Sequence, residues 1–569
     1  MVSSRGRLKV KFSHFCVSDS GYYNNIGDAE MVSINQPTHK LSTGQSQSQS
    51  SSSSPSLCPT TMVDQAATIQ GLSDDALLLI FSFHRILSSP SNPPLSTGWE
   101  WHVLAQVCQR WRNLLFASPR HLGVRLVISN RKQYGRPTLE CWPTLPISIW
   151  FRPQDTMFLR DEGRVIEALK HSDRIYEINL NVSDWMLGKS TAWMNDSFPA
   201  LESLDLTSPR DVTVLPSTFL GGSNSIPRKL RHIGLKNISF PTLPQLLLSS
   251  PNLVSLSLGF NYLGEVGPLS TEALTAILST TVQLERLHVY PYPLDRAYPE
   301  QRRTFSPSST GNLIILRALV TFDFGGPSAY LEDLVPRINM LLLEQLSVSQ
   351  TFRERALDIP QLSQFISRTN HLNSLPHRTS ITFTNEALTI RHCFQHPLPR
   401  GKPIYLSLSI RDNWSETDWR ASQVVHICGQ LSPFMSSVER LGIRVERPLR
   451  FFFDSDEPED EEMDTARWLE LFGSFKSVQD LQLWCLLGGS TFGIADALEE
   501  PTKETAQEVL PVLRILRIHG FQHHAENLPG IKAFVAAREL RGQPLTVHEE
   551  SKWGHEDEDT LETIDFTYA

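Results

Sequence analysis

Three short stretches of the sequence contain residue types that could bind phosphate, attack an ester or hold a metal ion. The first, Leu187-Gly188-Lys189-Ser190-Thr191, resembles the end of a phosphate-binding loop. Backbone amides wrap the phosphates in such a loop, which requires a glycine five residues before Gly188. That position is Ser183, and no apolar strand closely precedes it. The stretch therefore does not predict nucleotide binding.

The second stretch, Gly326-Pro327-Ser328-Ala329-Tyr330, begins like the turn that exposes a nucleophilic serine in esterases. The final glycine of that turn is replaced by Tyr330, and a proline beside the serine is a poor start for so strained a turn. The sequence does not favour an esterase.

The third stretch brings His519, His523 and His524 close together in the sequence. Zinc sites combine histidine with cysteine or carboxylate ligands at characteristic spacings, and no such partner stands at ligand spacing here. We predict exposed loop histidines. Because none of the three stretches proposes a catalytic mechanism, we expect no enzyme activity, no metal and no cofactor.

Length and charge exclude further classes of function. The chain has 569 residues, enough for an extensive core, and a net charge of −9. A general nucleic-acid binder would need a basic field, so no nucleic-acid partner is expected. The longest apolar run, Ala76–Phe81, is far shorter than the roughly 18–20 residues that span a bilayer, so no membrane partner is expected either.

The seven cysteines are odd in number and scattered, and none forms a Cys-x-x-Cys pair. This pattern is typical of neither a disulfide framework nor a zinc module, and it favours the reducing cytoplasm or nucleus.

Composition marks the two ends of the chain. Residues 1–65 are predicted to be a disordered tail, because the Gln-Ser repeats and serine run in 42–61 contain little to bury. Residues 550–569 are predicted to be an acidic tail. The acidic clusters at 454–464 and 556–559 are predicted to be solvated.

After residue 68 the sequence predicts two short amphipathic helices. Leu72-Ser73-Asp74-Asp75 provides a helix cap and two acids immediately before a predicted helix over Ala76–Phe83. A second helical pattern begins near Trp99, with a single apolar stripe at spacings of three and four: Trp101, Leu104, Val107, Cys108, Trp111 and Leu115. Helices with so apolar a joint face need a partner surface.

These residues resemble the F-box, a three-helix module. The match consists of Leu72, the Ile80-Phe81 pair, Leu104 and the run Val107-Cys108-Gln109-Arg110-Trp111-Arg112, with Ser73 where the family usually has proline. The flanking Trp99–His102 and Phe116–Arg120 are similar to the version common in mushroom-forming fungi.

The resemblance implies a module over residues 66–125 that docks on the Skp-type adaptor of a cullin-based SCF ubiquitin ligase. The implied adaptor-binding residues are those that match the family's apolar pattern: Leu72, Ile80, Phe81, Leu104, Val107, Cys108 and Trp111.

Beyond this module, a Leu-x-x-Leu-x-Leu cassette recurs with conservative changes. Its last two positions are two residues apart, so they share one face of a short strand, and several cassettes follow a helical stretch such as 243–249 or 271–281. Units of helix, turn and strand that stack side by side form a parallel sheet. The cassettes are Leu201/Leu204/Leu206, Leu230/Ile233/Leu235, Leu253/Leu256/Leu258, Leu284/Leu287/Val289, Leu343/Leu346/Val348, Val438/Leu441/Ile443, Val478/Leu481/Leu483 and Leu513/Leu516/Ile518.

Uneven spacing between cassettes predicts an irregular repeat. Residues 126–197 are assigned as a connecting segment and the start of the repeat domain, and 198–549 as its body. Within the body, Ile359–Thr369 is predicted to be a helix that feeds strands at 380–383 and 387–390. The expected fold is α+β or α/β: a small helical F-box, then an irregular leucine-rich-repeat-like solenoid with a parallel strand arc.

Together these features predict a substrate receptor of a ubiquitin ligase in the cytoplasm, the nucleus or both. Its partners would be the Skp-type adaptor, a cullin through that adaptor, and a target protein held by the repeat domain. The main alternative is an adaptor-bound scaffold that presents no target for ubiquitination. A third reading places an unrecognised enzyme in the repeat domain.

Overall fold

The computed structural model describes the greater part of the residues between 69 and 550. The predicted tails, residues 1–65 and 550–569, lie outside the described residues, as does the Gly188–Thr191 stretch; the exception is Glu550, which is the last residue of strand β20 (Thr546–Glu550) and not part of a tail. The chain divides into two compact units, Met1–Gly71 and Leu72–Ala569. In the first unit only Ile69–Gly71, a single 3-10 turn (η1), is described. The described ranges are 69–87, 100–119, 122, 125–129, 139, 145–151, 162–181, 195–208, 213–216, 218–220, 228–239, 243–260, 269–291, 313–351, 358–372, 376–384, 387–394, 404–411, 417–445, 465–485, 494–499, 509–519 and 529–550.

The second unit begins with three short helices: α1 (Asp74–Leu87), α2 (Glu100–Val107) and α3 (Gln109–Ala117). The Ser73 hydroxyl accepts a hydrogen bond from the Ala76 N–H at 3.2 Å, and two aspartates occupy the first turn of α1. The predicted cap is therefore confirmed, although the helix begins two residues earlier than predicted and continues to Leu87.

The single apolar stripe predicted from Trp101 to Leu115 is wrong. Cys108 has extended backbone angles (φ −158°, ψ 169°), so it separates α2 from α3. Residues on the two sides of this break no longer share one helical face, because the 3.6-residue period applies only within a continuous helix.

The remainder of the unit is built on one large sheet. Among the described residues, sixteen strands join edge to edge in it, as follows: β1 (Leu126–Ser129), β2 (Ile147–Phe151), β3 (Ile175–Asn181), β4 (Ser203–Thr207), β6 (His232–Lys236), β8 (Ser255–Gly259), β9 (Arg286–Tyr290), β11 (Thr321–Gly325), β13 (Gln345–Thr351), β16 (Ile404–Arg411), β15 (Ala387–Phe394), β14 (Pro376–Phe383), β17 (Arg440–Val445), β18 (Asp480–Cys485), β19 (Ile515–His519) and β20 (Thr546–Glu550). With the exception of β15, these strands run parallel to their neighbours.

The predicted cassettes form the core of this sheet. Leu204, Ile233, Leu256 and Leu287 pair in direct register across four successive strands, and each is buried. The other cassettes are buried on their strands in the same way. The prediction that the cassettes are buried parallel strands is confirmed. The cassette prediction did not include β3, β11 or β16, and on β11 Phe322 takes the place of the leucine.

Strand β15 departs from the predicted parallel arrangement, because it is antiparallel to both neighbours. Only two residues separate the turn residues Thr384 and Ala387, and the Thr384 N–H donates to the Ala387 carbonyl at 2.8 Å. So short a connection can join only antiparallel strands. The chain therefore places β14, β15 and β16 in reversed order between β13 and β17.

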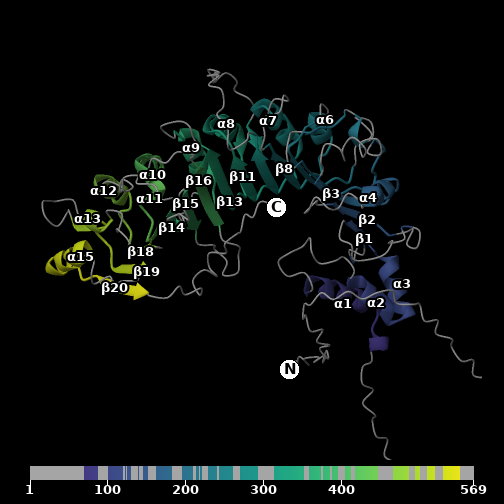
Figure 1. Ribbon diagram of the computed structural model, residues 1–569, viewed down its shortest axis with the longest axis horizontal. Helices are drawn as coiled ribbons and strands as arrows, with labels where there is room; N and C mark the ends of the chain where they lie inside the picture. The colour runs from purple at the N-terminus through teal and green to yellow at the C-terminus, as the bar shows by residue number, and fades with distance from the viewer. Residues whose placement is uncertain are drawn as a thin grey trace, which may run out of the picture. The chain divides into compact units, whose positions relative to one another are not determined.

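Helices from the connections complete the unit. Figure 1 shows α6 to α9 along the same side of the sheet. The helices after α3 are α4 (Glu162–Leu169), α6 (Leu243–Leu248), α7 (Thr271–Thr280), α8 (Ser328–Leu334), α9 (Pro360–Arg368), α10 (Thr417–Gln430), α11 (Ser432–Met435), α12 (Thr465–Gly473), α13 (Ile494–Glu499) and α15 (Pro529–Leu540), with a 3-10 turn η3 (Val335–Arg337). Two-strand sheets β5 (Thr213–Val214) with β7 (Ile238–Ser239), and β10 (Ile314–Ile315) with β12 (Ile338–Asn339), lie in the connections. The predicted helices at 243–249, 271–281 and 359–369 are confirmed as α6, α7 and α9.

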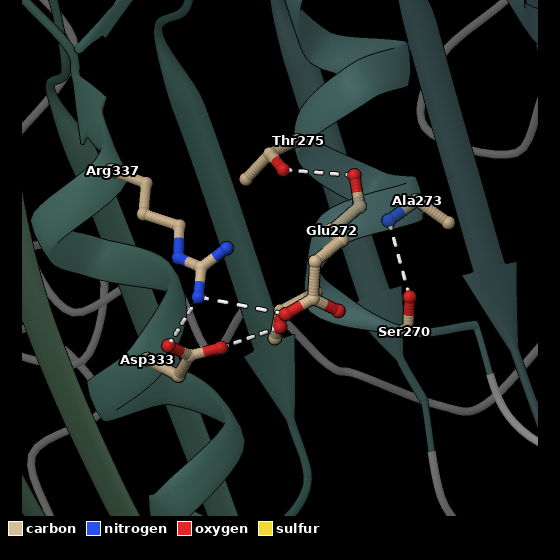
Figure 2. A network of polar contacts seen from close by, with 7 residues as sticks. Ser270, Glu272, Ala273, Thr275, Asp333 and Arg337 are labelled. Atoms are coloured by element: carbon tan, nitrogen blue, oxygen red, sulfur yellow. Dashed lines mark hydrogen bonds and ion pairs between the residues drawn. The ribbon is translucent and has the colours of Figure 1, made fainter. Parts of the chain in front are cut away.

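Polar contacts join helices of successive units (Figure 2). Ser270 caps α7, and the next residue, Thr271, donates its hydroxyl to Asp333 of α8. Arg337 binds Asp333 at 2.7 Å and Glu272 at 3.6 Å. Hydrogen bonding at the start of α7 lowers the pKa of the Glu272 carboxyl. We interpret this network as a structural link between helices.

His392 of β15 gives the folded protein a pH dependence. It is fully buried, its Nδ1 lies 2.8 Å from the Thr379 hydroxyl oxygen, and burial lowers its pKa from 6.5 to about 4. The His392 imidazole is therefore protonated below about pH 6.5 in the unfolded chain, but only below about pH 4 in the folded chain. The contribution of His392 to stability is complete above pH 6.5 and is lost as the pH falls toward 4.

We expect the free energy of unfolding to fall by about 2 kcal/mol from this residue between pH 7 and pH 5. Urea unfolding of the wild type and of His392→Asn at both pH values measures the difference. The variant should lose about 2 kcal/mol less than the wild type over this range. The same pH dependence in both proteins would show that His392 is not the titrating group.

Candidate functional site

The seven residues singled out by the F-box resemblance divide into two groups in the structure. Phe81 is 2% exposed, and Leu72, Leu104 and Trp111 are partly buried against the hydrophobic core. The other three, Ile80, Val107 and Cys108, are exposed. The side chains of the second group are the more accessible to a partner.

An aromatic pair holds the helical segment together. The Phe81 and Trp111 ring centroids are 4.8 Å apart at 63°, an edge-to-face contact between α1 and α3. Such pairs contribute about 0.5–1.5 kcal/mol beyond the burial of their surface. Leu77 and Leu115 are buried in the same core cluster. Trp111 therefore has a structural role, whatever part of it a partner contacts.

Arginine side chains fix the orientation of the three helices. The Arg110 guanidinium donates to the Leu72 carbonyl at 2.6 Å and to the Asp74 carboxylate at 2.5 Å, which ties α3 to the start of α1. The Arg112 Nε donates to the Ala105 carbonyl at 3.0 Å and so ties α3 to α2. Arg110 and Arg112, the polar residues around Trp111, therefore stabilise the packing of the three helices.

Large apolar side chains remain outside this core. Leu79 is 58% exposed, Ile80 39% and Phe83 55% on α1, and Val107 at the end of α2 is 56% exposed. We call these four residues the exposed apolar surface. Leu79 and Ile80 lie four and three residues before Phe83, so the α1 members lie on adjacent parts of the helix surface. Burying one such side chain completely contributes about 1.5–3 kcal/mol, which makes this surface suited to binding a partner.

The sequence analysis missed Leu79 and Phe83. A signal for them was present, because α1 has apolar residues on two faces: Leu77 and Phe81 are buried, whereas Leu79 and Phe83 are not. A helix with an apolar face beyond the one that its own core needs is a candidate for an interface.

The stretches considered for catalysis have structural roles where they are described. Ser328 is the first residue of α8 and is buried, and the Tyr330 hydroxyl donates to the Leu269 carbonyl at 3.1 Å. His519 lies on β19 and stacks on Trp484, with centroids 4.9 Å apart at 9°. The prediction of a loop histidine is thus wrong for His519, and His523 and His524 lie outside the described residues.

Two described cysteines differ sharply in exposure. Cys108 has an exposed free thiol at the junction of α2 and α3, whereas Cys428 is buried on α10. Burial raises the pKa of the Cys428 thiol to about 12. Of the two, Cys108 alone is accessible to a partner or a reagent in the folded chain.

Neither a metal centre nor a membrane span is found in the described part of the chain. There, no group of three His, Cys, Asp or Glu residues could hold a metal ion, and no helix is long and apolar enough to cross a bilayer. The exposure of Leu79, Ile80, Phe83 and Val107 makes the exposed apolar surface the candidate site. No protein-family model matches the chain, and no curated protein matches it.

Proposed function

We propose that the chain is an F-box substrate receptor that docks on the Skp-type adaptor of a cullin-based ubiquitin ligase. The observation that carries the proposal is the exposed apolar surface on a helical segment whose own core is already filled by Leu77, Phe81 and Trp111. Ile80 and Val107 belong both to this surface and to the residues that resemble the F-box. The adaptor would cover it.

We call the part of the chain that forms the sixteen-stranded sheet and its helices, from β1 to β20, the sheet domain. In this proposal the sheet domain is an irregular leucine-rich-repeat-like solenoid that holds the target protein. The receptor would perform no chemistry of its own. It would raise the local concentration of the target near a ubiquitin-conjugating enzyme recruited by the other subunits, as in any tethered reaction. The ubiquitin transfer itself would belong to those subunits, in the cytoplasm or the nucleus.

A scaffold that binds the adaptor without presenting a target is the alternative. Both proposals require the exposed apolar surface, so adaptor binding does not separate them. Transfer of ubiquitin to a bound protein does.

The test is to purify the tagged full-length chain with the adaptor and cullin, add activating and conjugating enzymes, and follow ubiquitin on each co-purifying protein. A receptor is expected to give at least one ubiquitinated partner that accumulates in cells under proteasome inhibition. Adaptor binding without any such partner would favour the scaffold. A chain that does not bind the adaptor would overturn both.

A further inference from the structure

The face of the sheet opposite the buried cassettes is polar, and its charge is uneven. Side chains alternate along a strand, so residues between the buried positions point away from the core. On β15, β14 and β17, three adjacent strands of the sheet, these outward positions include Arg378, Arg391 and Arg440. We call Arg378, Arg391 and Arg440 the arginine surface.

Two of these arginines stand directly opposite each other. Arg378 of β14 pairs in register with Arg440 of β17. On the other side of β14, Arg391 pairs with Ser380, two residues along the strand from Arg378. Like charges at directly opposite positions destabilise a sheet. An anionic partner would relieve this repulsion.

Two described acids next to these arginines also have other basic partners. Asp480, which stands opposite Arg440, is buried and lies 3.3 Å from the Arg517 Nε. Glu439 lies 2.8 Å from the His377 Nδ1. These acids therefore offset only part of the positive charge of the arginine surface.

An aromatic ring lies beside the arginines. Gly442 of β17 is buried, and the Trp484 ring lies only 2.7 Å from the position that a Cβ on Gly442 would occupy. A glycine is needed at this position for the ring to lie against the sheet. The Arg378 guanidinium donates to Gln482 of β18 at 3.3 Å, so it extends across β17. Arginine and tryptophan are enriched among residues that dominate binding energy in interfaces.

Some other strands have no arginine on this face, although Arg286 of β9 and Arg517 of β19 also lie at outward positions. Outward positions on β4 and β8 are Ser203, Asp205, Thr207, Ser255, Ser257 and Gly259. The whole chain has a net charge of −9, so a local excess of arginine on β14 to β17 is not a consequence of a basic composition. Complementary potentials steer and orient partners.

We propose that the arginine surface binds an acidic peptide segment, rich in aspartate and glutamate, of the protein that the sheet domain holds. The identification of the acidic segment as part of a ubiquitination target rests on the proposed function. The binding of an acidic segment to the arginine surface does not. Carboxylates would accept charge-assisted hydrogen bonds from the guanidinium groups, and an extended acidic segment could reach several of them.

The test measures fluorescence anisotropy of a labelled Glu-Gly repeat peptide with the purified full-length chain, beside a Gln-Gly peptide of the same length. We expect the glutamate peptide alone to bind, and its affinity to fall with added salt because exposed charges are screened. Arg391→Gln together with Arg440→Gln should lower the affinity about tenfold. Arg286→Gln is the matched control, because Arg286 is exposed at the first position of β9 as Arg440 is on β17.

Several results would overturn the proposal. The first is that the glutamate and glutamine peptides bind with the same affinity, and the second is that Arg286→Gln lowers the affinity for the glutamate peptide as much as the double variant does. The others are that a single-stranded DNA of the same charge binds as tightly as the glutamate peptide, or that a phosphoserine peptide binds and the glutamate peptide does not. Peptide binding that emerges only after the acids of 454–464 are changed to their amides would also overturn it, in favour of an internal occupant. Melting curves confirm that each variant is folded, and adaptor affinity should be unchanged in all of them. Loss of adaptor binding with retained peptide binding would count against the proposed function and leave this inference standing.

Discussion

Leu256→Asp is expected to unfold the sheet domain or to lower its melting temperature more than any surface substitution. Leu256 is fully buried on β8, in register with Ile233 and Leu287 of the neighbouring strands. An unpaired carboxylate at this position costs several kcal/mol, and the lost leucine contacts add about 2–5 kcal/mol. The total stability of a typical domain is only about 5–15 kcal/mol.

The matched control is Ser257→Asp, one residue along the same strand. Ser257 points to the opposite face, where it pairs with Gly234 and His288. We expect this variant to melt within a few degrees of the wild type in circular dichroism or calorimetry. Equal tolerance of aspartate at 256 and 257 would show that the cassette is not a strand with one buried face.

The parts of the fold that the sequence predicted follow from short-range periodicity. A leucine at 204, 256 or 287 is buried because each cassette repeats the same alternation of inward and outward side chains. On β11, Phe322 and Phe324 replace the aliphatic residues by which the cassette is recognised. No cassette was assigned to β3 either, although Ile175, Ile178 and Leu180 have the cassette spacing and are buried.

The order of β14, β15 and β16 was not predictable in the same way. The strands at 376–383 and 387–394 have the composition of any other strand, and their reversed order depends on the tight turn between Thr384 and Ala387. Pairing between strands is a tertiary property, and the sequence period describes only one strand at a time.

The sequence indicated the helical segment that contains the candidate site. It did not indicate which side chains of that segment are buried and which are exposed. Resemblance identified the segment, but it placed Phe81 and Trp111 in the same class as Ile80 and Val107. The extended backbone of Cys108 changes the relation between the residues on its two sides. No propensity of a single cysteine predicts such a break, so the division into core and exposed residues required the structure.

The exposed apolar surface and the internal aromatic pair should respond differently to mutation. Ile80→Ser together with Phe83→Ser should leave the chain folded, because both side chains are exposed on α1. Adaptor affinity should nevertheless fall by about 2.7 kcal/mol, or roughly a hundredfold, since a few large apolar side chains dominate such interfaces. Gln109→Ala, at an exposed polar position on α3, should change the affinity little.

Trp111→Ala should act by another route. Its ring contacts Phe81 inside the segment, so the substitution is expected to lower the stability of the helical segment by about 2–4 kcal/mol. Adaptor affinity should be measured by titration calorimetry and stability by melting curves on the same samples. Only the two measurements together distinguish a loss of contacts with the adaptor from a loss of stability of the helical segment. If the Ile80/Phe83 double variant binds the Skp-type adaptor at wild-type strength, the exposed apolar surface is not its docking site. If Trp111→Ala keeps both its melting temperature and its affinity, the aromatic pair does not hold α1 against α3.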